Sequence, residues 1–302
     1  LGNTGGTIDK LESIKGFRTK LSEEEFIDNI KEIGLALTGQ TGNLAPADKK
    51  IYALRDVTAI VDSIPLIASS IMSKKIGAGA IVLDVKVGSG AFMKNMQDAE
   101  KLAEEMVKIG SLAGRNTIAV ISDMDEPLGL AVGNALEVAE AVKTLKKEGP
   151  EDLINLCLEL GTQMLIASKV EENADKARAM LQNSIDDGSA YNKFLEFIKR
   201  QGGDITVFDD LDEFTECNYK IEVKADKEGY VQRIESELIG EASMILGGGR
   251  MTKEDVIDYS VGVKLSAKRG DYVKCGDCLA TIYAANKDKI LEEEGLIIKA
   301  FE

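Results

Sequence analysis

The chain has 302 residues, 44% of them hydrophobic, and its 37 Lys and Arg against 52 Asp and Glu give a formal charge of −15. So acidic a composition disfavours nucleic acid as a partner, and no run reaches the ~18 apolar residues that a membrane-spanning helix needs. The absence of histidine excludes imidazole bases, Ser–His and Cys–His nucleophile pairs and histidine-ligated zinc. From the length, at roughly 150 residues per domain, we expect about two domains, and from the composition we expect a cytoplasmic protein.

The first part of the chain predicts an α/β arrangement. Residues 22–33 begin with the capping-box pattern Ser-Glu-Glu-Glu and predict a helix. Apolar residues recur on one face of 97–109, which predicts a surface helix that ends at Gly110. Apolar and β-branched runs at 80–84 and 117–121 flank that helix, so the three segments together predict a βαβ unit.

Further along, the pattern changes from helical to strand-like. Pro150, followed by acidic residues, predicts the start of another helix, and 174–185 and 190–200 predict two more. From 219 to 283 the apolar runs become short and are separated by glycine turns. We therefore predict a domain boundary near 205–218 and a small β-rich domain after it.

Three segments carry residues suited to binding a ligand. The first, residues 1–7, is rich in glycine and threonine. Glycine leaves backbone N–H groups accessible and threonine adds a hydroxyl, a combination that suits an oxyanion. An ordinary loop is the alternative interpretation.

The second segment combines cations with hydroxyls. Tyr52 and Arg55 lie three apart on a helical stretch, and residues 62–65 contain a capping residue and a first-turn proline. In the helix that follows, Ser70 and Lys74 are four apart and share a face. Such groups could hold a planar, oxygen-bearing ligand, whereas the alternative is solvated charge on a surface helix.

The third segment, residues 84–93, reads Asp-Val-Lys-Val-Gly-Ser-Gly-Ala-Phe-Met. Its turn follows a predicted strand, and in open α/β sheets ligands bind at the carboxyl ends of strands. The spacing is not that of a dinucleotide fingerprint. A tight turn without a ligand remains an alternative.

Taken together, the motifs resemble one family. In order, they resemble motifs of the pyrimidine-nucleoside and thymidine phosphorylases, and the resemblance runs from Leu1 to about Tyr283. The matching segments are residues 2–14, 39–49, 52–58, 84–93, 124–129 and 133–138. Enzymes of this family are glycosyltransferases of nucleoside salvage, which displace a pyrimidine from uridine or thymidine with inorganic phosphate. The products are the free base and a pentose 1-phosphate.

The resemblance implies roles for individual residues. Arg55, Ser70 and Lys74 match the catalytic residues that contact the pyrimidine. Arginine's fixed fork suits two neighbouring acceptors, and lysine supplies a compact charge where the departing base becomes anionic. Tyr52 resembles a contact on the sugar side, and Thr7 resembles a phosphate-binding threonine.

A metal ion is also implied, although no organic cofactor is. In the pyrimidine-nucleoside type a potassium ion is held in part by residues that resemble Leu128, Ala131 and Glu140. Backbone carbonyl and carboxylate oxygens are ligands that suit a hard cation.

The implied fold is α/β, a mixed sheet flanked by helices. Residues 1–45 would begin the α/β domain, 46–77 would contribute to a partial helical domain, and 78–210 would complete the α/β domain. Residues 211–302 would form the C-terminal β-rich domain, similar to the barrel-sandwich of biotinyl carriers. The complete protein is expected to be a homodimer.

Two departures from the family leave alternatives open. Family members carry a Lys-His-Ser-Thr-Gly-Gly phosphate loop before the position of Leu1, and Asn3 stands where they usually have His. One alternative is therefore a catalytically incomplete fragment that folds or binds a pyrimidine without turnover. The other is a phosphoribosyltransferase, because anthranilate phosphoribosyltransferase resembles the same fold, but no acidic diphosphate-binding pair is evident.

Overall fold

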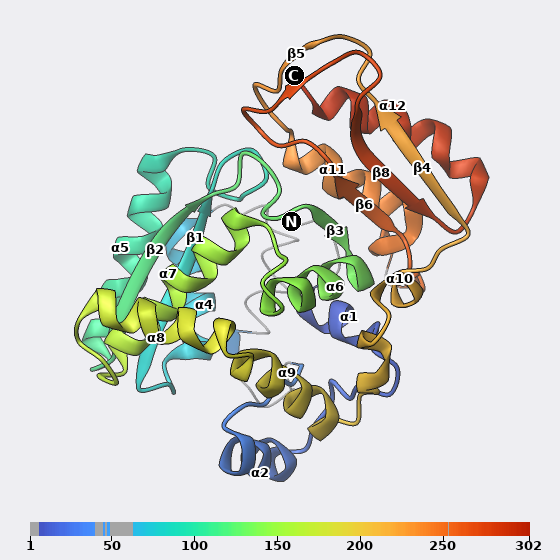
Figure 1. Cartoon of the computed structure of the whole chain (residues 1–302). Coiled ribbons are helices and arrows are strands. Elements are labelled where there is room, and N and C mark those ends of the chain that lie inside the picture. Colours follow the sequence, from blue (N-terminus) through green and yellow to red (C-terminus); the bar gives the residue numbers. More distant parts are fainter. Residues whose placement is uncertain (1–5, 40–44, 46, 49–62, 253) are drawn as a thin grey trace. The chain divides into compact units, whose positions relative to one another are not determined.

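The computed structural model describes residues 6–39, 45, 47–48, 63–252 and 254–302 (Figure 1). These residues form a mixed α/β structure. They divide into two compact units: unit 1 takes in the described residues of 1–39, 125–153 and 185–302, and unit 2 those of 40–124 and 154–184. Each unit is described by itself.

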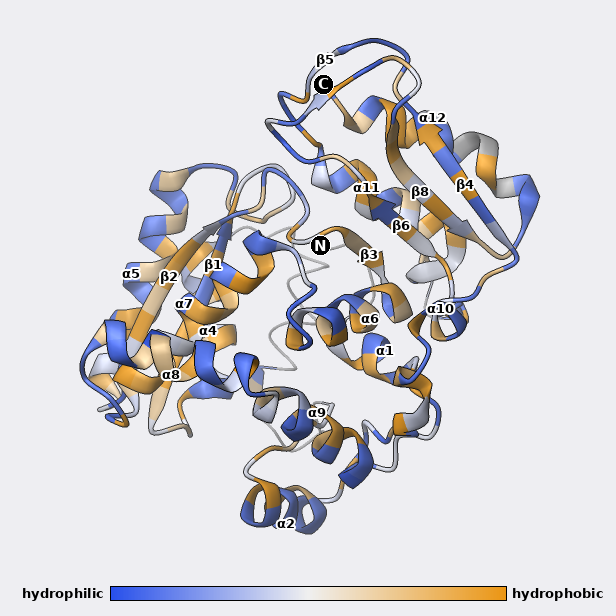
Figure 2. Ribbon diagram, in the orientation of Figure 1, coloured by the Kyte–Doolittle hydropathy of each residue, from blue (hydrophilic) through white to orange (hydrophobic). Residues whose placement is uncertain are grey.

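Unit 2 contains the predicted βαβ unit. Strand β1 (Ala80–Val87) pairs in parallel with β2 (Asn116–Asp123), and α5 (Met96–Leu112) connects them. Helices α4 (Ile64–Lys75) and α5 pack on one face of β1, whose apolar side chains there are at most 5% exposed. Figure 2 shows apolar residues of α4 and β2 in orange. Each such buried aliphatic side chain contributes about 1.5–3 kcal/mol.

The predicted end of α5 at Gly110 is wrong. The helix continues to Leu112, and Gly110 is buried within it. A Cβ at Gly110 would lie 2.0 Å from Thr117 Oγ1 of β2. Glycine is therefore present because helix and strand approach closely, and the left-handed turn comes later, at Gly114 with φ +72°.

Two long helices follow where the sequence predicts them. Helix α7 (Glu151–Ala167) starts directly after Pro150, and α8 (Ala174–Asp186) follows it. Both helices contain residues of unit 1 and of unit 2. In unit 2, the Asn116 side chain of β2 donates to the Ala167 carbonyl at 2.9 Å, which attaches the end of α7 to the βαβ unit.

One part of unit 1 is helical. Its helices are α1 (Thr7–Glu12), α2 (Glu23–Ile33), α6 (Asn134–Leu145), α9 (Ser189–Arg200), η1 (Ile205–Phe208) and α10 (Leu211–Phe214). The predicted capping box is confirmed, because Ser22 Oγ accepts from the Glu25 N–H at 3.1 Å and the Glu25 carboxylate accepts from the Ser22 N–H at 2.9 Å. Phe17 and Phe197 meet edge to face in the core between these helices.

The other part of unit 1 is an antiparallel sheet with helices beside it. The sheet has the order β3 (Ala131–Gly133), β6 (Gly262–Leu265), β8 (Cys278–Ala284) and β4 (Tyr219–Lys224). A second pair joins β5 (Gly229–Tyr230) to β7 (Tyr272–Val273). The region is less purely β than predicted, because it also contains α11 (Ser236–Ser243), η2 (Met244–Gly248), η3 (Lys287–Lys289) and α12 (Ile290–Ala300).

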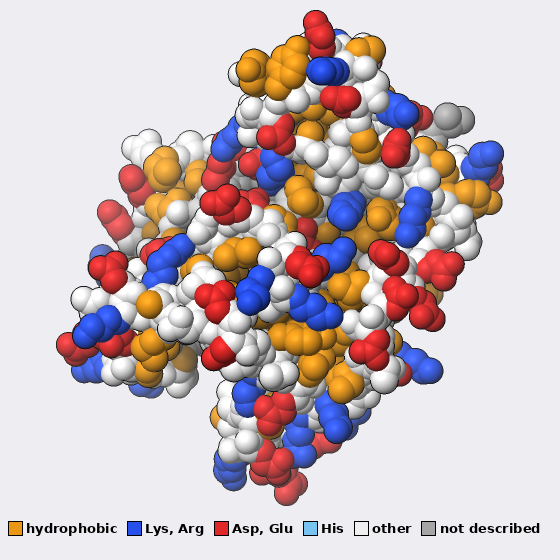
Figure 3. Space-filling model, viewed as in Figure 1, with side chains coloured by type: hydrophobic (Ala, Val, Ile, Leu, Met, Phe, Trp, Pro, Cys, Tyr) orange, Lys and Arg blue, Asp and Glu red, His pale blue; other side chains and the backbone are white. Residues whose placement is uncertain are grey.

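The surface carries charges of both signs. On the face drawn in Figure 3, Lys and Arg side chains lie among Asp and Glu. No helix in the described ranges combines the length and the apolar character that crossing a bilayer requires.

Candidate functional site

The Ser70–Lys74 pair lies on α4 in unit 2. Lys74 Nζ donates to Ser70 Oγ at 3.2 Å, so the prediction that these side chains share a helix face is confirmed. Ser70 is 7% exposed, whereas the Lys74 side chain keeps 31% of its surface exposed. The turn before them also follows the sequence pattern, because Ser63 is the N-cap and a proline lies in the first turn, although the Ser63 side chain makes no capping bond.

A third residue of this cluster, Asp48, was missed by sequence reasoning. Its Oδ2 atom lies 2.9 Å from Lys74 Nζ, and the residue is only 9% exposed. Asp48 stands in the motif 39–49, which was its only sequence signal, but no spacing rule connects residue 48 with residue 74. The ammonium group of Lys74 is therefore fixed by a hydroxyl on its own helix and by a buried carboxylate.

The other predicted residues of the substrate site are placed less fully. Tyr52 and Arg55 lie outside the described residues. Thr7 is exposed and is the first residue of α1, where the Gly6 N–H donates to the Asp9 carboxylate at 3.1 Å. Thr7 belongs to unit 1 and the Ser70–Lys74 pair to unit 2. Their roles toward a substrate stay predictions.

The charged residues of segment 84–93 contact neighbouring side chains of unit 2. Lys86 Nζ lies 2.9 Å from Asp84 Oδ2, and the Ser122 hydroxyl of β2 donates to the other oxygen of Asp84. The Gly90 N–H donates to the Met124 carbonyl at 3.0 Å. These contacts connect the ends of β1 and β2. They are consistent with the alternative that segment 84–93 is a tight turn that holds the two strands together.

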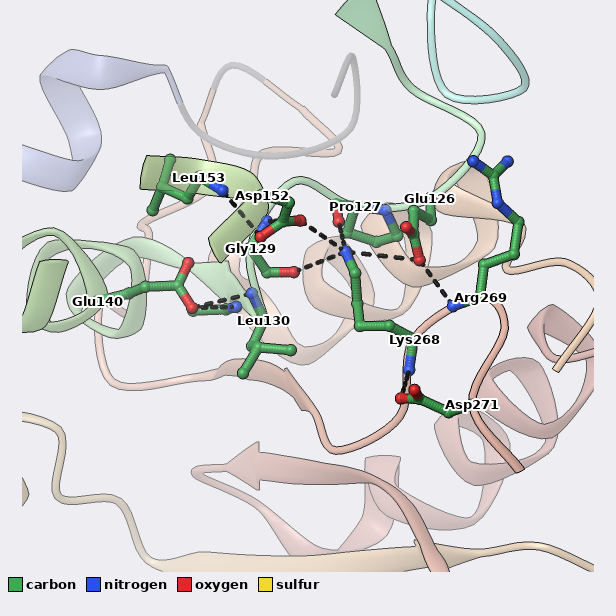
Figure 4. Close-up of polar contacts among 11 residues, drawn as sticks. Glu126, Pro127, Gly129, Leu130, Glu140, Asp152, Leu153, Lys268, Arg269 and Asp271 are labelled. Atoms are coloured by element: carbon green, nitrogen blue, oxygen red, sulfur yellow. Dashed lines mark hydrogen bonds and ion pairs between the residues drawn. The ribbon is translucent and has the colours of Figure 1, made fainter. Parts of the chain in front are cut away.

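Glu140 and the loop 126–131 form a second site, in unit 1 (Figure 4). Glu140 projects from α6, and its Oε1 atom accepts from the Leu130 and Ala131 N–H groups at 2.9 and 3.1 Å. Burial raises the pKa of Glu140 to about 7, and these two backbone hydrogen bonds only partly oppose that shift. A positive charge placed at this carboxylate would favour its ionised form.

Glycine at position 129 lets the loop approach the Glu140 carboxylate closely. Gly129 has φ +69°, and a Cβ there would lie 2.3 Å from Glu140 Oε2. Among the described residues, both backbone donors go to Oε1 and none goes to Oε2. The second carboxylate oxygen thus lies against Gly129, where the side chain of a larger residue would collide with it.

The backbone N–H and C=O groups of Ala131 point toward the side of β3 on which Glu140 lies. The Leu265 N–H donates to the Leu130 carbonyl at 2.7 Å, and Ala131 opposes Lys264 in the next pair of the ladder. Successive antiparallel pairs alternate between hydrogen-bonded and non-hydrogen-bonded types. The N–H and C=O of Ala131 therefore point away from β6, on the side where its N–H meets Glu140.

A cavity of about 300 Å³ adjoins this second site. Ala131 and Glu140 line it, together with Lys143 of α6, Lys264 of β6 and Tyr283 of β8. The cavity has room for water or a small ion beside these residues. The Glu140 carboxylate and the Ala131 carbonyl lie on the same side of β3, and such oxygen ligands suit a hard cation.

Comparison with known proteins gives consistent matches. Residues 1–191 match the glycosyl transferase family, a/b domain, and residues 230–301 match the pyrimidine nucleoside phosphorylase C-terminal domain. The chain is 58% identical over 290 residues to the pyrimidine-nucleoside phosphorylase of Staphylococcus aureus strain bovine RF122 / ET3-1, an alignment that covers 95% of this chain and 67% of the relative. It is 57% identical, with the same coverage, to the protein of that name in strain USA300.

Proposed function

The chain belongs to the pyrimidine-nucleoside phosphorylase family, and from this premise we propose that it catalyses the phosphorolysis of pyrimidine nucleosides. The observation that carries the proposal is the 58% identity over 95% of the chain. The contact between Ser70 and Lys74 supports it, because these residues match the family's base-binding pair and lie together.

In the proposed reaction, a phosphate oxygen forms a bond to C1′ of the pentose as the bond from C1′ to the pyrimidine nitrogen breaks. The base leaves with the electron pair, so negative charge develops on its ring and carbonyl oxygens. A fixed cation at that position stabilises the transition state more than the neutral substrate. Lys74 supplies this charge, and Ser70 adds a hydroxyl that can contact the same ring.

Asp48 and Ser70 hold the Lys74 ammonium in place before substrate arrives. A lysine side chain loses up to about 2 kcal/mol of rotamer freedom when it is fixed. Because contacts within the protein already restrict Lys74, less of that cost falls on the transition state. In the same proposal Arg55 binds the base beside Lys74, Tyr52 contacts the sugar and Thr7 contacts phosphate; these three roles rest on the resemblance.

We further propose that Leu128, Ala131 and Glu140 contribute to a potassium site. The proposal is supported by the Oε2 atom of Glu140, to which no described backbone group donates, by the cavity that Glu140 and Ala131 line, and by the orientation of the Ala131 backbone. When bound, the ion would supply a positive charge that keeps the Glu140 carboxylate ionised and draws backbone carbonyls toward it. A cytoplasmic location, a homodimer and a barrel-sandwich form for residues 211–302 belong to this proposal as expectations from the resemblance.

The decisive experiment measures release of uracil from uridine and of thymine from thymidine, with and without inorganic phosphate. We expect release that requires phosphate and yields equal amounts of pentose 1-phosphate. Lys74→Ala should lose most of the activity. Lys75→Ala is the matched control, because Lys75 is the next residue of α4 and its side chain is exposed. Release without phosphate would contradict the proposal.

The same assay separates the alternatives. A fragment that only binds would show calorimetric binding of a pyrimidine without turnover, and a protein extended upstream by the family's phosphate loop would then turn over. A phosphoribosyltransferase would instead require magnesium and a phosphoribosyl diphosphate.

A further inference from the structure

Lys268 is a charged residue of unit 1 that the proposed reaction does not use. It follows β6, in the segment that matches the C-terminal domain. Its Nζ atom donates to the carbonyls of Pro127 and Gly129, the latter at 3.1 Å, and to Asp152 Oδ2 at 3.0 Å. Figure 4 shows these contacts converging on the ammonium group. An ammonium has three N–H donors, and these partners account for all three.

The surroundings make this contact a fixed one. The Lys268 side chain is 19% exposed, and Glu126 Oε2 lies 3.5 Å from the ammonium. The same Glu126 oxygen accepts from the Arg269 N–H at 2.9 Å. Two carboxylates and two carbonyls therefore surround one partly buried cation, and removing it would leave several acceptors without their donor.

These contacts lie on both sides of Leu128. The carbonyls of Pro127 and Gly129, one before and one after Leu128, are held by Lys268. On the same loop, Asp152 accepts from the Gly129 N–H at 3.0 Å and Glu140 accepts from the Leu130 and Ala131 N–H groups. The backbone on either side of Leu128 is thereby fixed.

We propose that Lys268 is a positioning residue for the cation site formed by Leu128, Ala131 and Glu140. By holding the two neighbouring carbonyls, it sets the conformation of the Leu128 peptide and thus the affinity of the loop for a monovalent cation. The inference rests on the proposed function, because that proposal supplies the cation. It assigns to the C-terminal domain a direct part in shaping a site whose ligands lie in the other matched domain.

The chain supplies a matched control for this inference. Lys268-Arg-Gly-Asp271 and Lys274-Cys-Gly-Asp277 form two similar turns. In each turn the lysine N–H donates to the aspartate Oδ2 at 2.8 Å, and the glycine has φ near +90°, +96° at Gly270 and +91° at Gly276. The Lys274 side chain is exposed. Lys274→Met therefore removes the same charge from the same kind of turn without touching the loop.

The test measures the thermal midpoint of the 302-residue chain as choline chloride is replaced by KCl at constant ionic strength. Binding of K⁺ to the folded state stabilises it by RT ln(1 + [K⁺]/Kd), so the midpoint rises with the K⁺ concentration and the size of the rise gives the Kd. We expect the Kd of Lys268→Met for K⁺ to be about tenfold to a hundredfold higher than that of the wild type, the usual effect of losing a residue that orients metal ligands. Lys274→Met should match the wild type.

A purely structural role gives a different result. Lys268→Met would then lower the midpoint in both salts and leave the Kd for K⁺ unchanged, which overturns the inference. If Lys268→Met fails to fold, Lys268→Arg replaces it in the test, because arginine keeps the charge but carries it on a planar group of different geometry. A weaker K⁺ response of this variant supports the inference, and an unchanged response refutes it.

The two proposals fail separately. Phosphate-dependent uracil release is measured on the same wild-type preparation. A wild type that turns over uridine but shows no K⁺ response refutes the role of Lys268 and leaves phosphorolysis standing. A wild type that responds to K⁺ but releases no uracil contradicts the proposed reaction.

Discussion

Arg250 donates two hydrogen bonds to the Asp9 carboxylate, from Nη1 at 3.1 Å and from Nη2 at 3.0 Å, although 241 residues separate Arg250 from Asp9 in the chain. The carboxylate of Asp9 also accepts from the Gly6 N–H at the start of α1. The residue thus connects the first helix of the described chain to the segment that follows η2, both in unit 1.

Breaking the ion pair between Arg250 and Asp9 should destabilise unit 1 modestly. The Arg250 side chain is 43% exposed and that of Asp9 12%, so solvent weakens the pair and we expect Arg250→Met to cost about 1 kcal/mol of unfolding free energy. Urea denaturation measures it. Arg250→Lys should recover only part, because lysine lacks the two-pronged geometry; full recovery would show that charge alone matters.

Asp48→Asn should lower activity without unfolding the protein. Asparagine keeps the size of the side chain but removes the charge that lies 2.9 Å from Lys74 Nζ. Because the ammonium is then less firmly held, we expect kcat/KM for uridine to fall about tenfold, or ~1.4 kcal/mol. Steady-state kinetics at saturating phosphate measure it, with the thermal midpoint as a check on folding. An unchanged kcat/KM would separate Asp48 from the site.

Gly129→Ala should destabilise the protein more than the same change at Gly114. Both glycines have similar positive φ, +69° and +72°, so an alanine is conformationally strained at both. At Gly129 the new Cβ would also lie 2.3 Å from Glu140 Oε2, whereas nothing lies within 4 Å at Gly114. Overpacking of this kind costs about 1–3 kcal/mol. Equal losses of unfolding free energy in the two variants would show that the contact between the new Cβ and Glu140 adds no cost.

The contribution of Asp152 to stability should disappear in acid. Burial alone would raise the pKa of Asp152, but hydrogen bonds from Lys268 and from the Gly129 N–H outweigh it and lower that pKa. A lowered pKa means that the carboxylate stabilises the folded state above its ordinary pKa, near 3.9, and that this stabilisation is lost as the pH falls through the lowered value.

The thermal midpoints of the wild type and Asp152→Asn test this. The wild type should melt at the higher temperature at pH 7, and the gap should shrink as the pH falls below about 4. Asp175→Asn, at an exposed position on α8, serves as the control. A gap that widens in acid would give the opposite sign and contradict the assignment.

Local signals in the sequence predicted local structure. The capping box at Ser22 is fixed by residues three apart, and the contact between Ser70 and Lys74 by one helical turn. Gly110 shows the limit of this reasoning, because glycine marks both helix ends and close packing, and only the position of Thr117 decides between them. Helix α11 was missed since short apolar runs next to glycine resemble strands.

Contacts between distant segments were beyond such reasoning. The partners Asp48 of Lys74 and Asp152 of Lys268 belong to other parts of the chain, and no periodicity connects them. Strand β3 has three residues, Ala131–Gly133, too few for an alternating pattern. The resemblance to a family named Leu128, Ala131 and Glu140 together, whereas residue spacing alone would have left them unrelated.

Strand β3 has a consequence for how this protein can be taken apart. It is encoded within residues 1–191, which match one family domain, yet its ladder partner β6 lies in residues 230–301, which match another. The two matched segments therefore share one sheet. In a chimera that takes one segment from a relative, β3 and β6 come from different proteins and have to pair with each other. Recombination within this family should tolerate breakpoints only where β3 and β6 come from the same parent.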